Sequence, residues 1–455
     1  MNTEFNIKKR IDELTPEMLD DLARLVKYDS QLGSSAPGMP FGEGPAAVLK
    51  EALDIAESMG FETKNLDNYC GYAQIGTGEK IIGLVAHLDI VPPGEGWDTD
   101  PFTLVKKGDT VYGRGVSDDK GAAIASLYTL KLLKESGIPL NSRIRVILGC
   151  NEETGSKCME HYNQVEEPVT AGFTPDGNFP GIHGEKGMLK MTAFSKNTRI
   201  ISMNGGFVSN AVCSRCTTIV EENDVNVEKL KASLSQSPLD SYSVSCEDGK
   251  VRIEAVGRAA HASTPLLGVN DASFTMKALE EAGMDDDFVR YYNSHIGTDC
   301  SGKGYGIDVQ DEYGDLTLNN GIVKSEGSRI SATIDIRFPV TYSVEQLTKM
   351  AEPYLENEDG VTVIDSGAQP LFYPVDSDLV QSLYSAYVQV TGDTETKPMV
   401  IGGGTYAKSV PGIIAFGCEF LGNDNHIHDA NEKLDIPELK QQVEIYVQAV
   451  SNLMK

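Results

Sequence analysis

A histidine and an aspartate directly follow an apolar run near residue 85. The run IIGLVA at residues 81–86 has the composition of a buried strand, and His87 and Asp89 come at its end. A histidine in this position needs a partner for each ring nitrogen. One solution is a metal ion on one nitrogen and a carboxylate on the other. The alternative is a core histidine that hydrogen-bonds to backbone groups, and this stretch alone leaves both interpretations open.

Further acids and histidines stand at the ends of expected strands or in glycine-rich loops. They lie in the stretches GRGVSDDKG, NEETGS, TPDG and NHIHDANE, and the residues are Asp118, Asp119, Glu152, Glu153, Asp176, His426 and His428. Loops that follow separate strands of an α/β sheet can meet at one edge. Each stretch alone has an ordinary explanation, such as an Asp that caps a helix. Together they supply the ligand types of two zinc ions that share one carboxylate.

The composition argues against several classes of binding partner. The chain has 455 residues, a formal net charge of -28 and eight cysteines. We expect no binding to nucleic acid or to an anionic membrane, because phosphate contacts need clustered Lys and Arg. The N-terminal segment has no apolar stretch of a secretory signal, and we see no run of the roughly 20 apolar residues of a membrane helix. A cytoplasmic protein with reduced thiols is expected. Cys213 and Cys216 have CxxC spacing, but ordinary packing is the favoured interpretation.

The pattern of elements indicates an α/β domain that is interrupted by an insertion. Apolar runs typical of strands buried on both faces alternate with helices in residues 1–186, and this pattern returns in residues 369–455. Residues 187–368 instead alternate apolar and polar side chains, which is typical of antiparallel strands with one wet face. We therefore expect a mixed, mostly parallel sheet between helices, with an inserted α+β domain. The first helix is expected at residues 16–30, with Thr15 and Pro16 at its start.

These motifs resemble those of the zinc aminoacylase and carboxypeptidase superfamily, which includes carnosinase, glutamate carboxypeptidase, desuccinylases and peptidase V. The resemblance covers the whole chain and rests on AHLDIVPPGEGWDTDPF, GRGVSDDKG, NEETGS, PDG, AHAS and HDANE. The long insertion and GGGTYAKS point most closely to the peptidase V-type, carnosinase-like dipeptidases. The resemblance implies a zinc-peptidase catalytic domain with the insertion as its lid, and for that lid a doubled ferredoxin-like fold.

The resemblance implies a dinuclear zinc centre, with two Zn2+ ions per chain. His87 and Asp176 correspond to ligands of one ion, and Glu153 and His428 to ligands of the other. Asp118 corresponds to the carboxylate that bridges both ions. Mn2+ or Co2+ are the expected substitutes for zinc. His428 is preferred to its neighbour two residues earlier because it begins the motif HxxNE, which Asn431 and Glu432 complete.

The residues next to these ligands have supporting roles under the same resemblance. Glu152 corresponds to the general base, which takes a proton from water and passes it to the leaving amine. Asp89 corresponds to the carboxylate that orients His87. Asp119 corresponds to a structural position that a cis peptide joins to Asp118. Trp97 matches no catalytic position and is interpreted as a hydrophobic anchor of its loop.

Residues of the insertion and of a glycine-rich loop are implied in substrate binding. His261 matches the histidine that reaches in from the lid. Asn210 corresponds to a further polar contact, although Cys213 replaces a proline that is usual nearby. Arg337 resembles a residue that binds the substrate carboxylate, and the alternative is a salt bridge at a strand edge. The loop that resembles the rest of this carboxylate site contains Gly402, Gly403, Gly404 and Thr405. The remaining histidines, which we interpret as structural, are His161, His183 and His295.

The expected activity is that of a dipeptidase, which hydrolyses the peptide bond of free dipeptides with a metal-activated water. An amino-acid deacylase or desuccinylase shares the same catalytic residues and stays open as an alternative. A non-catalytic peptide-binding relative would be expected to lack Glu152 or one of the ligands, and the sequence lacks none of them. The insertion is long enough for two copies of a short lid. We therefore expect His261 to complete the active site of its own chain, in a monomer or a loose dimer.

Overall fold

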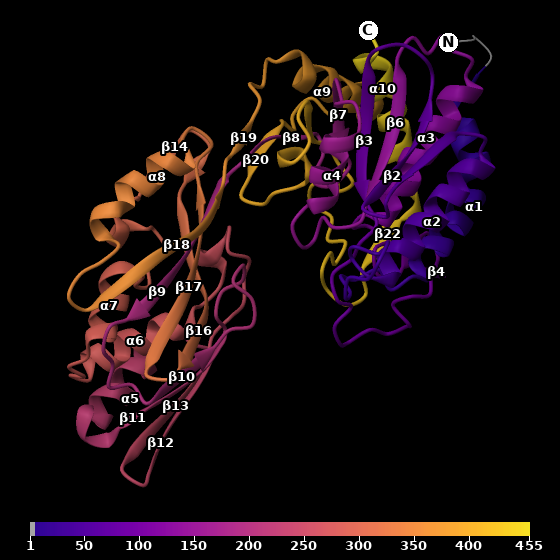
Figure 1. Ribbon diagram of the computed structural model, residues 1–455. Coiled ribbons are helices and arrows are strands. Elements are labelled where there is room, and N and C mark those ends of the chain that lie inside the picture. The colour runs from indigo at the N-terminus through magenta and orange to yellow at the C-terminus, as the bar shows by residue number, and fades with distance from the viewer. Residues whose placement is uncertain (1–4) are drawn as a thin grey trace. The chain divides into compact units, whose positions relative to one another are not determined.

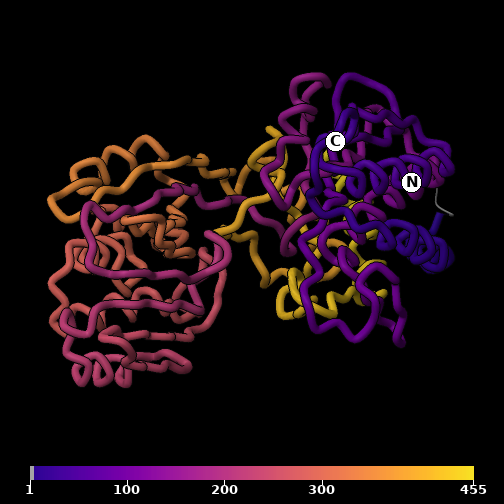
Figure 2. The backbone as a smooth tube through the Cα atoms, turned by 60° about the horizontal axis from the view of Figure 1, so that its bottom comes forward, coloured from indigo at the N-terminus to yellow at the C-terminus, as the bar shows by residue number. Residues whose placement is uncertain are grey.

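The structure, a computed structural model, describes residues 5–455 and divides them into two compact units. Unit 1 comprises the chain up to Gly184 together with Tyr373–Val400 and Gly404–Lys455, and unit 2 comprises Glu185–Phe372 and Ile401–Gly403. The two ends of the chain, indigo and yellow in Figure 2, therefore build unit 1 together. No helix within residues 5–455 is long and apolar enough to cross a membrane.

A mixed sheet forms the centre of unit 1 (Figure 1). Seven of its nine strands lie in the order β1 (Glu62–Leu66), β2 (Cys70–Ile75), β6 (Arg143–Gly149), β3 (Ile81–His87), β7 (Ala171–Thr174), β21 (Ile413–Ala415) and β8 (Ile182–Glu185). The other two, β19 (Leu371–Phe372) and β20 (Met399–Ile401), both pair with β8. The inner strands β6, β3, β7 and β21 run parallel to one another, and the outer pairs are antiparallel. Every residue of β3 is buried, as expected for a strand that is covered on both faces. The predicted α/β fold with a mixed, mostly parallel sheet is confirmed.

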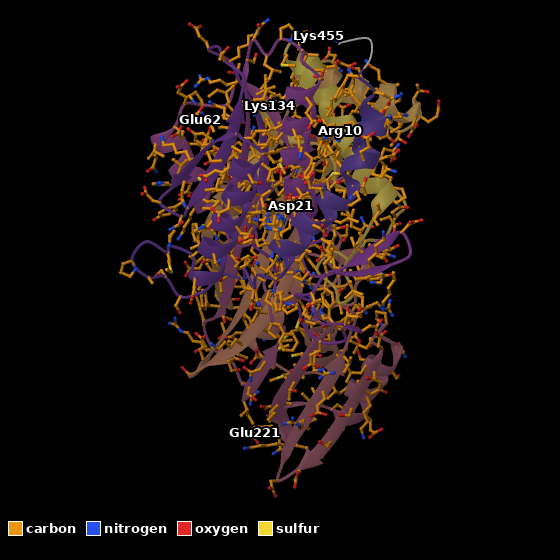
Figure 3. The ribbon with its side chains drawn as sticks, turned by 90° about the vertical axis from the view of Figure 1, so that its right-hand side faces the viewer. Arg10, Asp21, Glu62, Lys134, Glu221 and Lys455 are labelled. Atoms are coloured by element: carbon orange, nitrogen blue, oxygen red, sulfur yellow. The ribbon has the colours of Figure 1, made fainter. Side chains whose placement is uncertain are left out.

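Helices pack on this sheet and on one another. They are α1 (Ile7–Val26), α2 (Glu43–Ser58), α3 (Lys120–Glu135), α4 (Lys157–Val165), α9 (Asp378–Thr391) and α10 (Ile436–Leu453). α3 packs against β3 and β6, α10 packs against α3 and β7, and α1 packs against α3. Figure 3 labels two α1 residues that make this last contact, Arg10 and Asp21. Arg10 Nε donates to Glu135 Oε2 at 2.7 Å, and Tyr128 Oη donates to Asp21 Oδ2 at 2.9 Å.

The predicted start of the first helix is wrong. α1 begins at Ile7, where the Asn6 side chain caps it by accepting from Lys9 N, and it ends at Val26. Pro16 lies inside the helix instead of at its start. Buried apolar residues continue at helical spacing on both sides of the proline, and this burial outweighs the loss of one backbone hydrogen bond.

A small antiparallel sheet in unit 1 ties a C-terminal segment to an N-terminal one. Its strands are β4 (Val105–Lys107), β5 (Thr110–Tyr112) and β22 (Lys433–Asp435), and β5 lies between the other two. β22 leads directly into α10. The chain passes between the units within or next to β8 and the short strands β19 (Leu371–Phe372) and β20 (Met399–Ile401).

Unit 2 is built on an antiparallel sheet with helices packed on it. The strands lie in the order β12 (Ser241–Glu247), β13 (Lys250–Val256), β11 (Arg215–Glu221), β10 (Ser202–Gly205), β16 (Thr317–Glu326), β17 (Arg329–Phe338), β9 (Gly187–Ser195) and β18 (Gly360–Ala368). The helices are α5 (Val227–Gln236), α6 (Asp271–Glu281), α7 (Asp287–His295) and α8 (Val344–Ala351). A short hairpin of β14 (Gln310–Asp311) and β15 (Gly314–Asp315) completes the strands of the unit.

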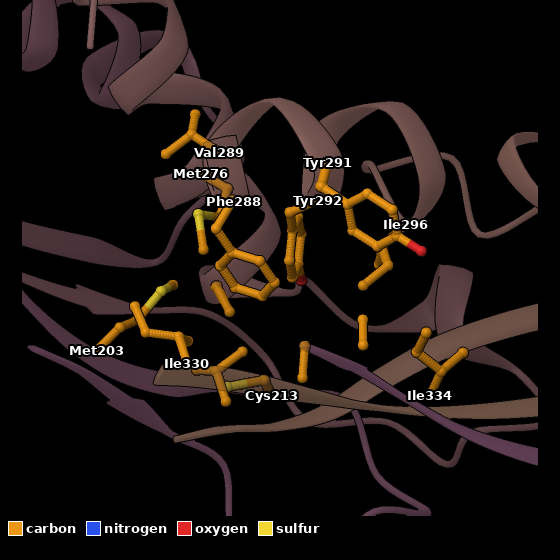
Figure 4. Packing of buried hydrophobic residues seen from close by; sticks show 14 of the residues in the cluster. Met203, Cys213, Met276, Phe288, Val289, Tyr291, Tyr292, Ile296, Ile330 and Ile334 are labelled. Carbon is orange, nitrogen blue, oxygen red and sulfur yellow. The ribbon is translucent and has the colours of Figure 1, made fainter. Parts of the chain in front are cut away.

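The sheet of unit 2 contains two ferredoxin-like groups, each with four strands and two helices. One group comprises β9, α7, β16, β17, α8 and β18, and its strands lie in the order β18-β9-β17-β16. The other comprises β11, α5, β12, β13 and α6, and its fourth strand in the sheet is β10, which precedes β11 in the chain and lies between β11 and β16. The predicted doubled ferredoxin-like fold is therefore present in a single sheet. Its core lies between the sheet and the helices. Figure 4 shows Phe288 and Tyr292 of α7 directed toward Ile330 of β17 and Met203 of β10, and all four residues are buried.

Candidate active site

Three strands of unit 1 deliver chemically active side chains to the same edge of the sheet. His87 is the last residue of β3, the pair Glu152 and Glu153 follows β6, and Asp176 follows β7. Because β3, β6 and β7 are parallel, their carboxyl ends lie together. His87, Glu152 and Asp176 each offer a ligand atom within 4.8 Å of the others. The cluster that was expected from separate loops is thus assembled around His87.

Asp118 lies between the two histidines of the cluster. Its Oδ1 is 2.9 Å from His87 Nε2, and its Oδ2 is 2.9 Å from His428 Nε2. His428 Nε2 is also 3.5 Å from Glu153 Oε2. One carboxylate therefore faces an imidazole with each of its oxygens, which is the arrangement that a carboxylate bridging two metal ions requires. His87, Asp118 and Glu153 also have ligand atoms within 4.8 Å of one another.

His428 and His426 differ clearly in position. His428 reaches Asp118 and Glu153, whereas His426 Nε2 lies 3.7 Å from Asp424 Oδ2 and its Nδ1 lies 3.4 Å from the carbonyl of Ala430. Both histidines have positive φ, at 65° and 54° respectively. The backbone of this loop is therefore turned so that only one of the two imidazoles is directed at the carboxylates.

Two further aspartates hold the cluster in place. The carboxylate of Asp89 accepts hydrogen bonds from the backbone N–H groups of Glu152 and Glu153, each at 3.0 Å. His87 Nδ1 donates to the main-chain carbonyl of Asp89 at 3.0 Å, and the Asp89 Oδ1 atom lies 3.6 Å from the same nitrogen. Asp119 Oδ2 accepts from the His87 backbone N–H at 3.0 Å, and the peptide bond between Asp118 and Asp119 is cis. Asp89 thus orients the loop of the paired glutamates as well as His87.

The pKa values of the cluster show the consequences of burying several acids together. Burial and the charge of Asp176 raise the pKa of Glu152 well above its usual range. Burial and the charge of Asp118 raise the pKa of Glu153. Burial opposes ionisation of Asp118 as well, but hydrogen bonds from His428 and His87 outweigh it and hold its pKa below the usual range. Contacts with Asp118 and Glu153 raise the pKa of His428 to about 11. The acids therefore need positive charge close by, and protonated imidazoles or metal ions can both supply it.

The side chains of the cluster fit divalent metal ions. Imidazole and carboxylate are the ligands that zinc takes in catalytic sites. Glu153 Oε1 is buried without a hydrogen-bond partner among residues 5–455, and a metal ion would satisfy this oxygen. Glu152 lies as close to His87 and Asp176 as a ligand would, so distance alone does not separate a base from a ligand at this position.

Tyr406 belongs to the surroundings of the cluster and was not foreseen from the sequence. It is fully buried, and its ring stands edge-on to the His87 imidazole with a centroid distance of 6.2 Å and an interplanar angle of 87°. Gly149, at the end of β6, makes room for it, because a Cβ atom there would lie 2.1 Å from Tyr406 Oη. Tyr406 stands in the stretch GGGTYAKS. From the sequence, only the glycines and Thr405 of this stretch are predicted to bind substrate.

Trp97 packs its loop as expected and also contacts a buried cation. Its Nε1 donates to the carbonyl of Pro93 at 2.7 Å, and the Arg114 guanidinium carbon lies 5.3 Å from the ring centroid. Asn431 joins the same loop to the His428 segment, since its Oδ1 accepts from Asp98 N at 2.9 Å. These contacts hold the Trp97 loop next to the segment that carries His428.

Unit 2 carries His261 and Asn210 on paired segments. Ala262 N donates to the Asn210 carbonyl at 2.9 Å, and both side chains are exposed. The Ser263 backbone N–H donates to His261 Nδ1 at 3.2 Å, and Ser263 Oγ lies 2.7 Å from the same nitrogen. A backbone N–H can only donate, so Nδ1 is an acceptor and the neutral imidazole carries its proton on Nε2.

Arg337 is buried in unit 2 and held by two partners. Its Nε and Nη2 donate to the two carboxylate oxygens of Asp335 at 2.6 and 3.2 Å, and its Nη1 donates to the Gly402 carbonyl at 2.9 Å. Gly402 has no space for a side chain, because a Cβ atom would lie 2.4 Å from Ser263 Cβ. Gly403 follows in the same loop, and Thr405, in unit 1, caps a short helix by accepting from Ala407 N at 3.1 Å.

The histidines without a motif make contacts typical of packing. His161 stacks on Tyr69 at 4.3 Å between ring centroids, and His295 stacks on Tyr291 at 4.1 Å. His183 Nδ1 lies 2.8 Å from the Tyr373 carbonyl. Cys213 and Cys216 are buried free thiols, and burial raises the pKa of both.

Comparisons with known proteins identify the family of the chain. Residues 83–452 match peptidase family M20/M25/M40. YtjP of Bacillus subtilis (strain 168), which is named provisionally as a dipeptidase, is 32% identical over 472 residues, covering 100% of both chains. Among solved structures, the Saccharomyces cerevisiae dipeptidase Dug1p is similar with a TM-score of 0.60 at 14% identity, and human carnosine dipeptidase 1 with a TM-score of 0.58 at 15% identity. Each alignment covers 98% of both chains.

Proposed function

The chain belongs to peptidase family M20/M25/M40, whose members are metal-dependent, and from this premise we propose that it is a dinuclear zinc dipeptidase that hydrolyses free dipeptides. The observation that carries the proposal is Asp118, whose carboxylate oxygens each lie 2.9 Å from the imidazole of a different histidine, beside a cluster of further acids. The dipeptidase names of the full-length relatives support the choice of substrate.

The ligands proposed for the metal ions follow the geometry of the cluster. His87 and Asp176 would hold one Zn2+, Glu153 and His428 the other, and Asp118 would hold both. When bound, the two ions lower the pKa of a water molecule to about 7 and polarise the carbonyl of the scissile bond. Mn2+ and Co2+, which accept the same ligand types, are the proposed substitutes.

Glu152 is the proposed general base. Its carboxylate lies beside His87 and Asp176, and Asp89 fixes its backbone N–H. Burial and the charge of Asp176 raise its pKa, which favours acceptance of a proton by this carboxylate. In the proposed reaction, Glu152 removes a proton from the attacking water and delivers it to the nitrogen of the leaving amine as the peptide bond breaks. The products are two free amino acids.

Residues of unit 2 are proposed to bind the substrate. His261, with its proton on Nε2, would donate to the developing oxyanion, and Asn210 on the neighbouring segment would add a polar contact. Arg337 would bind the substrate carboxylate. Asp335 already occupies its Nε and Nη2 edge, so the contact would come from the Nη1 side next to Gly402. Gly403 and Thr405 would complete this carboxylate site.

The division of labour between the units is part of the same proposal. Unit 1 would be the catalytic domain and unit 2 the lid, with domain limits at 1–186, 187–368 and 369–455 and hinges near Gly187 and Gly367. His261 would act in its own chain, in a monomer or a loose dimer. We place the protein in the cytoplasm, where free dipeptides would be its substrates.

A substrate panel tests this function against its closest alternative. Purified protein loaded with Zn2+ would be supplied with free dipeptides, N-acetyl amino acids and N-succinyl amino acids. We expect hydrolysis of dipeptides with a free amino group at least tenfold faster than that of either acylated class. Preference for an acylated amino acid would identify a deacylase instead, and absence of hydrolysis in every class would identify a binding protein. Glu152→Gln, purified in parallel, controls for contaminating peptidases.

A further inference from the structure

Glu432 is a fully buried acid that lies outside the cluster but on the same segment as His428. The segment between them runs through the HDANE motif and continues into β22. β22 pairs with β5, and the backbone of Gly113 donates to the Glu432 carbonyl at 3.1 Å. The C-terminal segment that carries His428 is therefore attached by main-chain bonds to the residues that lead to Asp118.

The Glu432 carboxylate organises the loop that ends at Asp118. Its Oε2 accepts from Arg114 Nη1 at 2.8 Å and from the backbone N–H of Gly115 at 2.9 Å. Its Oε1 accepts from the backbone N–H groups of Ser117 at 2.8 Å and of Asp118 at 3.0 Å. Each oxygen thus accepts two hydrogen bonds, and all of them come from one short loop more than 300 residues away in the chain.

Arg114 completes this connection from the other side. It is buried, with 1% of its surface exposed, and its Nη2 donates to the carbonyl of Asp429 at 3.1 Å. Asp429 is the residue directly after His428. Glu432 and Arg114 therefore bind each other, and each also binds the backbone of the segment opposite: Glu432 the loop before Asp118, and Arg114 the backbone next to His428.

We propose that Glu432 is a positioning residue that sets the distance between Asp118 and His428 and thereby the affinity for metal. Glu432 fixes the backbone of Asp118, and its own segment presents His428, whose Nε2 lies 2.9 Å from Asp118 Oδ2. The two side chains come from segments more than 300 residues apart in the chain, and this carboxylate joins their backbones directly. The inference rests on the proposed function in one respect, that Asp118 and His428 bind metal.

Glu432→Gln is the sharpest test because it preserves the shape of the side chain and replaces one acceptor oxygen by a donor NH2 group. The amide has one oxygen and one NH2 group. Since each oxygen of the carboxylate accepts from two donors, the NH2 group would face two donors whichever way the amide is turned. The loop must then shift, and Asp118 shifts with it.

Two measurements with metal alone read out this shift. The affinity for Zn2+ is measured by competition with a chromophoric chelator, and the visible absorption of the Co2+-loaded protein reports the geometry of the ligands. Removing a group that orients a metal ligand typically weakens binding about 10- to 100-fold. We expect a loss of this size in Glu432→Gln, together with a changed Co2+ spectrum.

Glu166→Gln is the matched control. The Glu166 side chain is also largely buried in unit 1, at 8% exposure, and its Oε2 accepts from Arg145 Nη1 at 3.2 Å. Its ion-pair partners Lys64 and Arg145 are not among the proposed metal ligands. This variant loses a buried ion pair in the same unit, so it measures the effect of general destabilisation. We expect its Zn2+ affinity to stay within about twofold of that of the unchanged protein, with the same Co2+ spectrum.

The outcomes separate this inference from the proposed function. Unchanged Zn2+ affinity and an unchanged Co2+ spectrum in Glu432→Gln would overturn the inference, and so would an equal loss in Glu166→Gln. If Glu432→Gln does not fold, Glu432→Asp, which keeps the charge but shortens the side chain, is judged by the same two measurements. If the unchanged protein binds Zn2+ but cleaves no dipeptide, the proposed substrate is wrong, and the metal measurements still decide the role of Glu432.

Discussion

At the scale of single residues, the site depends on acids that share partners. Asp118 faces an imidazole with each oxygen, and Asp89 accepts the backbone N–H groups of both Glu152 and Glu153. Hydrogen bonds to charged groups contribute about 1.5–3 kcal/mol each, which offsets part of the cost of burying these carboxylates together. The same contacts fix the direction of each side chain. Adjacent glutamates can therefore have different tasks.

Substitution of the two glutamates should separate the base from the ligand. We expect Glu152→Gln to keep its full metal content and to lose activity by about 10²- to 10⁴-fold, since only the proton acceptor is removed. Glu153→Gln should lose metal, because its Oε2 lies 3.5 Å from His428 Nε2, where the second metal ion is proposed to bind. Elemental analysis beside initial rates decides between them. Equal loss of metal from both variants would show that Glu152 is also a ligand.

Ser263→Ala should act through His261. The hydroxyl is 2.7 Å from Nδ1, and one neutral hydrogen bond of about 0.5–1.5 kcal/mol corresponds to a 2- to 10-fold fall in kcat. The KM should change little, because the proposed contact strengthens in the transition state. Steady-state kinetics of Ser263→Ala are compared with those of Ser243→Ala, an exposed serine on β12 of the same unit. Identical kinetics in both variants would remove Ser263 from the account.

Site residues that stand in short local motifs could be predicted from the sequence. Residues whose role depends on contacts with distant parts of the chain could not. His87, Asp118, Glu153 and His428 stand in short stretches with unusual combinations of residue types, and the structure brings them together. The role of Glu432 depends on backbone donors more than 300 residues away, which no local pattern shows. The hydrogen bonds from the backbone of Glu152 and Glu153 to the Asp89 carboxylate likewise cannot be read from a local pattern. They form because strands β3 and β6 are neighbours in the sheet.

At the scale of elements, strand patterns gave reliable predictions where burial is regular. β3 and β6 are continuous apolar runs, and β9 and β13 alternate, as their sheets require. The start of α1 was mispredicted because a proline inside a helix looks like a helix start in the sequence. Burial of the apolar face on both sides of that proline decides the outcome, and burial depends on α3 and α10, which come later in the chain.

The first residue of α6 should make the stability of the protein depend on pH. Asp271 has no exposed surface, and burial raises its pKa to about 6. The folded state then binds the proton more tightly than the unfolded state, so stability falls as the pH rises from about 4 to 6 and stays lower above that. The shift from an ordinary pKa near 3.9 corresponds to roughly 3 kcal/mol at most.

Asp271→Asn should therefore stabilise the protein at pH 8 and do so less at pH 5. Thermal or urea unfolding at both pH values, with reducing agent present, measures the difference. An equal effect of the substitution at the two pH values would contradict the argument. A loss of stability at pH 8 would show that the carboxylate makes favourable contacts at the start of α6 that exceed its cost of burial.

At the scale of the whole molecule, the insertion repeats one arrangement in a single chain. The two four-stranded groups of unit 2, β10-β11-β13-β12 and β18-β9-β17-β16, form one sheet. A chain that contains both copies has no need of a partner's lid, which supports the proposal that His261 serves its own chain. Room for two copies could be read from the length of the insertion, but the place of β10 as the fourth strand of one group could not, because its pairing with β11 and β16 is set by tertiary contacts.

Complementation tests whether the active site is complete in one chain. Glu152→Gln and His261→Ala proteins, each inactive, are mixed under conditions that exchange subunits. We expect no recovery of activity at any ratio, because each chain would lack a residue that its partner cannot supply. Activity that rises toward a maximum at equal amounts would mean that His261 enters from a second chain. Size-exclusion chromatography of the mixture establishes whether exchange took place.

Titration of the metal-free protein with Zn2+, followed by the rate of hydrolysis of a free dipeptide, tests the central claim most directly. The proposed centre has ligands for two ions that share Asp118, and neither histidine alone completes it. We expect a rate near zero after chelation, an increase with added Zn2+ and a plateau near two equivalents per chain. Full activity in the chelated protein, or a metal-loaded protein that cleaves no dipeptide, would contradict the account.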